Sequence, residues 1–85
     1  SESLKVFLQD CIERDEAGDL AVTELMEAYF DYCPSRGWEP LPSPAAQAQL
    51  PTLMLELFRV SRRHDIKRGT NVRGFKGVRL KQEAN

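Results

Sequence analysis

The stretch RVSRRHDIKRGTNVRGFKGVRL, residues 59–80, decides the fold because it is typical of two β-strands joined by a polar loop. Residues 59–66 place β-branched residues among polar ones, and residues 75–80 form a second β-like run. The loop between them, residues 67–71, contains Gly69 and an Asn, two residue types that tolerate positive φ. We therefore expect a C-terminal β-hairpin with a flexible basic tip, of the kind called a wing.

Upstream of this hairpin, apolar residues at three- and four-residue spacing predict two amphipathic helices. The first should end at Gly18, because glycine readily takes the conformation that terminates a helix. Residues 20–22 then form an expected minimal strand. Thr23 is the expected N-cap of the second helix, which Pro34 and Gly37 close. The two apolar stripes comprise Leu4, Phe7, Leu8, Cys11 and Ile12, and then Val22, Leu25, Met26, Tyr29, Phe30 and Cys33.

A third helix is predicted over residues 43–58, with Ser43 as its N-cap and Pro44 at its first position. Pro51 lies inside this helix and removes one backbone hydrogen bond, so we expect a kink or two short helices. The resulting order is helix, short strand, helix, turn, helix and hairpin. It predicts an α+β fold of the winged helix-turn-helix type, with three helices, as a single domain over residues 1–85.

The charge of the chain is divided between its two parts. Residues 59–85 carry nine Lys and Arg and two acids, a net +7, whereas residues 1–58 carry three basic residues and eleven acids, a net −8. A basic hairpin on an acidic body suits a polyanion, because neutralised phosphates release condensed counterions. The other interpretation is a solvated strand surface that keeps the protein in solution, and charge alone favours neither.

Several classes of function lack the residues that they need. The sequence has no paired nucleophile and base, and its single histidine, His64, lies in an Arg-rich strand where general-base chemistry is disfavoured. Cys11 and Cys33 fall on apolar helical stripes and are expected to be core thiols. No metal-ligand spacing or Gly-rich phosphate loop occurs. We therefore expect no enzymatic activity of the domain itself, no cofactor and no metal.

The sequence also bears on location and context. It contains no apolar run long enough to span a bilayer and no signal-peptide pattern, so we expect no membrane contact and a cytoplasmic protein, or a nuclear one in a eukaryote. It starts at Ser1 without Met, so we expect the domain to belong to a longer protein. Other domains of that protein are candidate partners.

The candidate binding residues lie on the third helix and the hairpin. The helix has no Lys or Arg between Ser43 and Phe58, so most of the affinity should come from the hairpin, where Arg can contact phosphates or pair with guanine. The candidate readers on the helix are Gln47, Gln49 and Thr52. The candidates on the hairpin are Arg62, Arg63, His64, Lys67, Arg68, Asn71, Arg73 and Lys76.

Three segments resemble, in order and spacing, the winged-helix domain that closes many phage-, plasmid- and poxvirus-type primase-helicases. They are TELMEAYFDYC at 23–33, GWEPL at 37–41 and RGFKGVRL at 73–80, and the likeness covers about two thirds of the chain. The pattern is also similar to the DNA-binding domain of the regulatory factor X transcription factors, in which the wing does much of the base reading. In that likeness the corresponding wing residues are Arg62, Arg63 and Arg68.

The resemblance implies an accessory domain of a replication protein that binds duplex DNA mainly through its basic wing. One departure concerns the third helix, where an Ala- and Gln-rich run and Leu50-Pro51 replace the family's early Phe and terminal Gly. This departure weakens the transfer of contacts to the helix. If the wing carries the binding, changing Arg62, Arg63 and Arg68 together to Ala should abolish it and leave the fold intact.

The alternative function is protein–protein interaction. Many winged helices dock other subunits, and the acidic first two helices suit a basic partner. In that case no nucleic acid should bind even at low salt.

Overall fold

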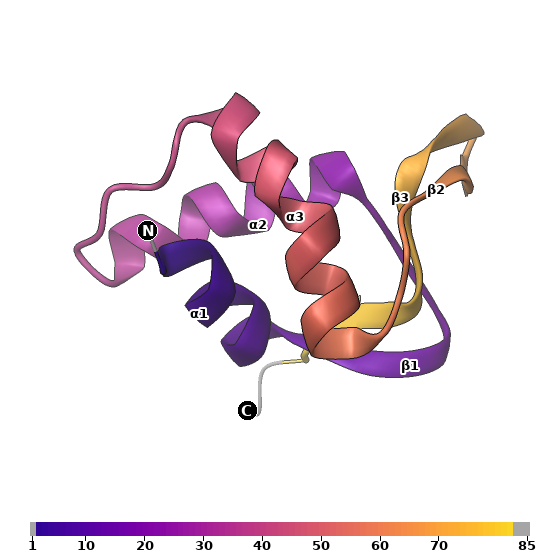
Figure 1. The fold of residues 1–85 in the computed structure, drawn as a ribbon, viewed down its shortest axis with the longest axis horizontal. Coiled ribbons are helices and arrows are strands. Elements are labelled where there is room, and N and C mark those ends of the chain that lie inside the picture. Colours follow the sequence, from indigo (N-terminus) through magenta and orange to yellow (C-terminus); the bar gives the residue numbers. More distant parts are fainter. Residues whose placement is uncertain (1, 83–85) are drawn as a thin grey trace.

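A computed structural model describes residues 2–82 and confirms an α+β fold, with three helices and one three-stranded antiparallel sheet (Figure 1). In chain order the elements are α1 (Ser3–Cys11), β1 (Ile12–Ala21), α2 (Val22–Ser35), α3 (Ser43–Phe58), β2 (Arg63–Arg68) and β3 (Thr70–Leu80). The tip of the β2–β3 hairpin lies at the opposite side of the molecule from α1. Within residues 2–82, no helix combines the length and apolar character needed to cross a membrane.

The sheet has the strand order β1-β3-β2, so β3 is central and pairs antiparallel with both neighbours. Gly74 of β3 pairs with Ala21 of β1, and the space around it is tight. A Cβ at this position would meet the Leu20 carbonyl oxygen and would lie 2.8 Å from the Ile66 side chain. Glycine is therefore required at this position, because a Cβ would collide with the backbone of β1 and with a side chain of β2.

β1 is longer than the sequence predicted. The first helix ends at Cys11 rather than near Gly18, and ten residues form the strand that was expected to span only residues 20–22. Ile12, which belongs to the apolar stripe of the expected helix, is the first residue of β1 and is buried there. The helix end predicted from the apolar periodicity was wrong, because from Ile12 onward the backbone pairs with β3 instead of forming helical hydrogen bonds.

A bulge explains how this polar segment joins the sheet. The register with β3 holds up to Arg14 and resumes at Asp19, so residues 15–18 lie opposite the single residue Gly77. Gly77 has a φ of 85°, in the left-handed region that favours glycine. Bulges bend a strand and increase its twist, and Figure 1 shows β1 turning sharply along its length.

The start of α2 also differs from the prediction. The helix begins at Val22, so the N-cap position is Ala21 rather than Thr23. Ala21 has no side-chain acceptor, but the Glu24 carboxylate accepts a hydrogen bond from the Ala21 amide at 2.9 Å. The end of the helix agrees with the prediction, because α2 stops one residue after Pro34.

α3 spans the predicted residues 43–58 as one helix, so of the two alternatives expected at Pro51, a kink or two short helices, the second is wrong. Its N-cap is Pro42 rather than Ser43. Pro51 is tolerated inside the helix because the buried face continues on both sides of it and packs against the core. The buried residues of that face are Ala46, Leu50, Met54 and Phe58.

The hairpin is confirmed, and it is tighter than expected. Gly69, with a φ of 81°, is the only residue between β2 and β3, whereas the whole of 67–71 was predicted as loop. Lys67 pairs with Asn71 across the two strands, and Asn71 does not have a positive φ. Residues 59–62, expected to be β-like, precede β2. The hairpin is therefore a paired ribbon almost to its tip.

One hydrophobic core joins the helices to the sheet. Tyr29 is fully buried in it, where its hydroxyl accepts a hydrogen bond from the Leu41 amide at 2.9 Å. Cys33 is buried and Cys11 is partly buried, and both thiols are free, as expected of core cysteines. The largest fully buried side chains are Tyr29, Phe7, Phe75, Leu4, Leu8, Ile12, Leu25, Leu50, Met54, Ile66, Val78 and Cys33.

Candidate nucleic-acid interface

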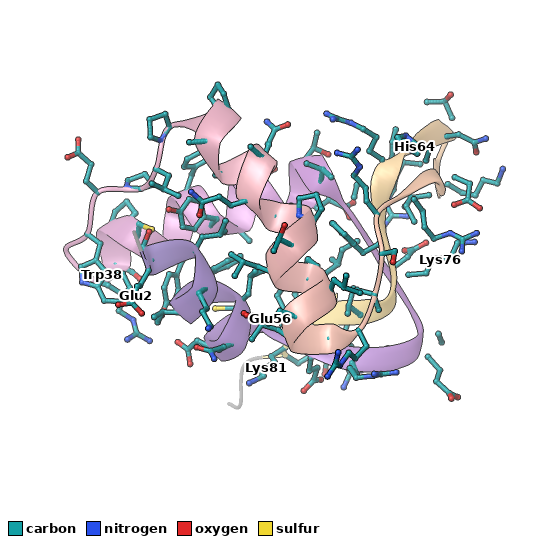
Figure 2. All side chains as sticks on the ribbon, in the orientation of Figure 1. Glu2, Trp38, Glu56, His64, Lys76 and Lys81 are labelled. Carbon is teal, nitrogen blue, oxygen red and sulfur yellow. The ribbon has the colours of Figure 1, made fainter. Side chains whose placement is uncertain are left out.

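All eight candidate residues of the hairpin are exposed, although the Arg68 side chain is partly covered. Figure 2 shows His64 and Lys76 on the β2–β3 ribbon, at the opposite side of the molecule from α1. His64 makes no hydrogen bond or ion pair within residues 2–82. The paired ribbon thus presents these residues to solvent. Their positive charges differ in whether a carboxylate of the protein lies beside them.

Three cations of the hairpin region have no carboxylate partner in the described part of the chain. Arg62 makes no hydrogen bond or ion pair there. The Lys67 ammonium donates to the Asn71 side-chain oxygen at 2.7 Å, and the Arg73 guanidinium donates to the Gln47 side-chain oxygen at 3.4 Å. These two acceptors are neutral amides. The three positive charges therefore stay uncompensated and are available to an external anion.

Two other cations share one carboxylate. The Arg63 guanidinium donates two hydrogen bonds of 2.8 Å to Asp65, and the Lys76 ammonium lies 3.5 Å from the same carboxylate. The Arg63 hydrogen bonds hold the pKa of Asp65 well below its usual range, so the carboxylate stays ionised. Arg63 and Lys76 therefore bring less free charge to the hairpin than their number suggests.

Arg68 is bound to the body of the protein rather than free at the tip. Its Nε donates to Glu24 at 2.8 Å, and its Nη2 donates to Asp19 at 2.8 Å. Its Nη1 donates to the Lys67 carbonyl at 2.8 Å. The Glu24 and Asp19 carboxylates raise the pKa of Arg68 above its ordinary value. This Arg68 clamp joins the hairpin tip to the start of α2 and the end of β1, two elements far away in sequence.

The polar residues of α3 divide into two groups. Gln47 is half-buried and lies against the hairpin, because it accepts from Arg73 and donates to the Ser43 hydroxyl at 2.9 Å. Gln49 and Thr52 are exposed and form no described hydrogen bond with the hairpin. The structure therefore brings one of the three helix candidates together with the hairpin candidates.

Two arginines at the end of α3 were not among the candidate residues. Arg59 has a φ of 61°, caps the helix and is exposed without a charged partner among residues 2–82. Arg14 of β1 donates to the Phe58 carbonyl at 3.1 Å. Cations are favourable at the negative end of a helix dipole. Arg59 could have been found from its place at the expected helix end, whereas the Arg14 contact depends on the fold.

The described residues contain no group of three or more His, Cys, Asp or Glu side chains that could hold a metal ion. The chemistry that this region offers is electrostatic. Guanidinium and ammonium groups on an exposed ribbon can neutralise phosphates, and one amide side chain lies beside them.

The Arg68 clamp predicts a pH dependence of the hairpin tip. The Arg68 hydrogen bond holds the pKa of Glu24 below its ordinary value of 4.5, so the ionised form is favoured in the folded state. The stabilisation is complete above pH 4.5 and is lost as the pH falls through the lowered pKa. We expect amide hydrogen exchange at the hairpin tip to accelerate several-fold as the pH falls below the lowered pKa of Glu24, after correction for the intrinsic pH dependence of exchange.

The matched control is Glu24→Gln, which keeps an acceptor for the Ala21 amide but has no charge to titrate. In this variant the tip should exchange faster at neutral pH and change less on acidification. Identical pH profiles of the two proteins would show that Glu24 does not hold the tip.

A scan against protein-family models finds no model that matches this chain, and a search of curated proteins finds no matching sequence.

Proposed function

We propose that this chain is a winged-helix module of a primase-helicase-type replication protein and that it binds duplex DNA mainly through the β2–β3 hairpin. Three features support the winged-helix assignment. The element order α1-β1-α2-α3-β2-β3 is the order expected of a winged-helix domain, with α2 and α3 as the helix-turn-helix pair and the hairpin as the wing. The hairpin is tied to the body through the pairing of β3 with β1. The family likeness at 23–33, 37–41 and 73–80 falls on α2, its following turn and β3.

The observation that carries the DNA-binding proposal is the set of uncompensated cations on the hairpin and at the residue just before it, Arg62. Arg62, Lys67 and Arg73 are exposed and face only neutral partners or solvent among residues 2–82. The chain has thirteen acidic residues and a net charge of −1, yet no carboxylate among residues 2–82 pairs with these three cations. The positive charges of this region are therefore separated from the negative charges of the rest of the protein. Such a surface suits a ligand with regularly spaced negative charges.

The hairpin and α3 would have different roles in binding. The three cations would neutralise phosphates and release counterions, which supplies affinity without sequence preference. Gln47 lies beside Arg73, so this pair is the place where a base edge could be read, since Arg recognises guanine and Gln recognises adenine. The Arg68 clamp would fix the angle of the hairpin and lower the entropy that is lost on binding.

This proposal predicts binding to a short fluorescein-labelled DNA duplex that weakens steeply with salt. If four to six phosphates are contacted, the logarithm of the association constant should fall against the logarithm of the salt concentration with a slope of about −4 to −5. Fluorescence anisotropy between about 50 and about 200 mM NaCl measures this slope.

Single-stranded DNA and duplex RNA of the same length serve as comparisons, and both should bind more weakly than duplex DNA. Stronger binding to either would assign the hairpin to that nucleic acid instead. No binding to any of the three at the lowest salt concentration would contradict the proposal.

A further inference from the structure

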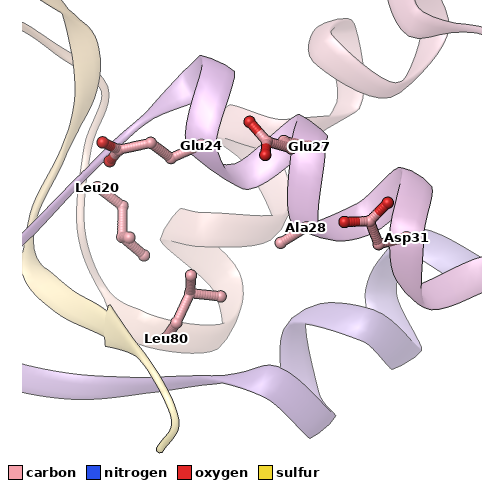
Figure 3. Close-up of a pocket in the computed structure, with 6 residues that line it drawn as sticks. All are labelled: Leu20, Glu24, Glu27, Ala28, Asp31 and Leu80. Atoms are coloured by element: carbon pink, nitrogen blue, oxygen red, sulfur yellow. The ribbon is translucent and has the colours of Figure 1, made fainter.

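A second surface of the protein lies between α2 and the C-terminal end of β3. A hollow of about 400 Å³ opens there (Figure 3). A neighbouring hollow of about 410 Å³ shares Ala28 and Leu80 with it and continues to Phe7 and Cys11. We call the two together the acidic groove. The first hollow is lined by Leu20, Glu24, Glu27, Ala28, Asp31 and Leu80.

The floor of the acidic groove is apolar. Leu80 is 37% exposed, one of few large apolar side chains on the described surface that are so accessible, and Ala28 of α2 is partly buried beside it. Figure 3 shows Leu20 and Leu80 together below the α2 helix. Each hollow has the size to receive a large apolar side chain, and covering Leu80 would remove apolar area from water.

The rim of the groove on α2 is negative. Glu27 and Asp31 are exposed, lie four residues apart on one face of the helix and have no hydrogen-bond or ion-pair partner among residues 2–82. Glu24 is already bound to Arg68. Among the described residues that line the second hollow, Lys81 is the only cation, and its ammonium donates to the Gln9 carbonyl at 3.3 Å. The free charge along α2 is therefore that of two carboxylates.

We propose that the acidic groove binds an amphipathic basic segment of another protein, with apolar side chains in the two hollows and Lys or Arg against Glu27 and Asp31. The two hollows require apolar side chains, and the carboxylates require cations one helical turn apart, so a partner helix meets both conditions. The hairpin tip of a second copy does not, because residues 67–71 contain no apolar side chain. This inference does not rest on DNA binding.

The probe is a synthetic helical peptide with Leu on one face and Lys on the other. Two control peptides carry Glu in place of Lys or Gln in place of Leu. Titration into the ¹⁵N-labelled chain should shift the amide signals of Leu20, Ala28 and Leu80 with the first peptide only. Signals confined to the hairpin, or equal responses to all three peptides, would overturn the proposal.

Variants of the chain test the groove directly. The E27Q/D31N variant should bind the Leu/Lys peptide about tenfold more weakly, since two exposed ion pairs are lost. The E16Q/E39Q variant removes the same charge from exposed positions outside the groove and should bind as the unchanged chain does. An L80Q variant should weaken binding through the apolar floor, with its fold checked by circular dichroism.

Two outcomes contradict the inference. Equal weakening in E27Q/D31N and E16Q/E39Q would mean attraction to the net charge rather than to the groove. Self-association of the unchanged chain in sedimentation, lost in E27Q/D31N, would assign the groove to a second copy. Duplex DNA binding should persist in E27Q/D31N. A failure of the acidic-groove proposal can therefore be told apart from a failure of the DNA-binding proposal.

Discussion

An R62A/K67A/R73A variant should bind duplex DNA at least about tenfold more weakly than the unchanged chain at low salt. The three side chains are the hairpin cations without a carboxylate partner among residues 2–82, so their removal costs the protein no described ion pair. The salt slope should become shallower by about one unit for each phosphate contact removed. Fluorescence anisotropy gives both quantities, and circular dichroism checks the fold.

The control is K5A/R36A/K81A, which removes the same formal charge from cations outside the hairpin but also breaks the ion pairs of Lys5 with Glu56 and of Arg36 with Asp10. It should change duplex affinity much less. Equal losses in the two variants would show that binding depends on net charge and not on the hairpin. The triple change of Arg62, Arg63 and Arg68 is a less clean test, because Arg68 also holds the hairpin against the body.

Gly74→Ala should strongly destabilise the fold. The added Cβ would collide with the Leu20 carbonyl oxygen, would lie 2.9 Å from the Ala21 Cα and would press on Ile66. The first two are backbone groups of β1, so β1 and β3 must separate. We expect a loss of about 3 kcal/mol or more in the free energy of unfolding. That is a large share of the about 4–13 kcal/mol typical of 85 residues.

Gly69→Ala provides the comparison. Its φ of 81° also disfavours a side chain, but no atom lies within 4 Å of the added Cβ. Its cost should be about 1 kcal/mol, from backbone strain alone. Urea unfolding of both variants measures the difference. If the two substitutions cost the same, the close approach of the strands at Gly74 is not what makes glycine necessary there.

The helices were predictable from the sequence where an apolar face repeats over several turns. α2 and α3 each bury residues at three- and four-residue spacing, and the range of α3 was predicted from the pairing of Ser43 with Pro44. β1 was not predictable in the same way. Its middle, residues 15–18, is acidic and contains Gly18, which is typical of a loop, and only the bulge opposite Gly77 lets it join the sheet.

The sequence allowed us to predict that the hairpin exposes basic residues, but not which of these residues pair with a carboxylate of the protein. The basic hairpin follows from residues 59–80, and its eight candidates are exposed. The partners of Arg68 are 44 and 49 residues away in sequence, so no local sequence pattern predicts the Arg68 clamp. Arg62 and Arg68 are both arginines of a basic segment, and only the fold distinguishes the free one from the bound one.

The central position of β3 has a consequence for how the domain would work inside a longer protein. Arg73 lies in the first half of this strand, and Leu80, its last residue, follows seven residues later, roughly 20 Å away along the strand. A nucleic acid on the hairpin and a peptide in the acidic groove would therefore both contact residues of one strand, β3. If the nucleic acid and the peptide belong to one complex, binding of either would hold the other near its own site at about millimolar local concentration, and two weak contacts would act as one stronger attachment.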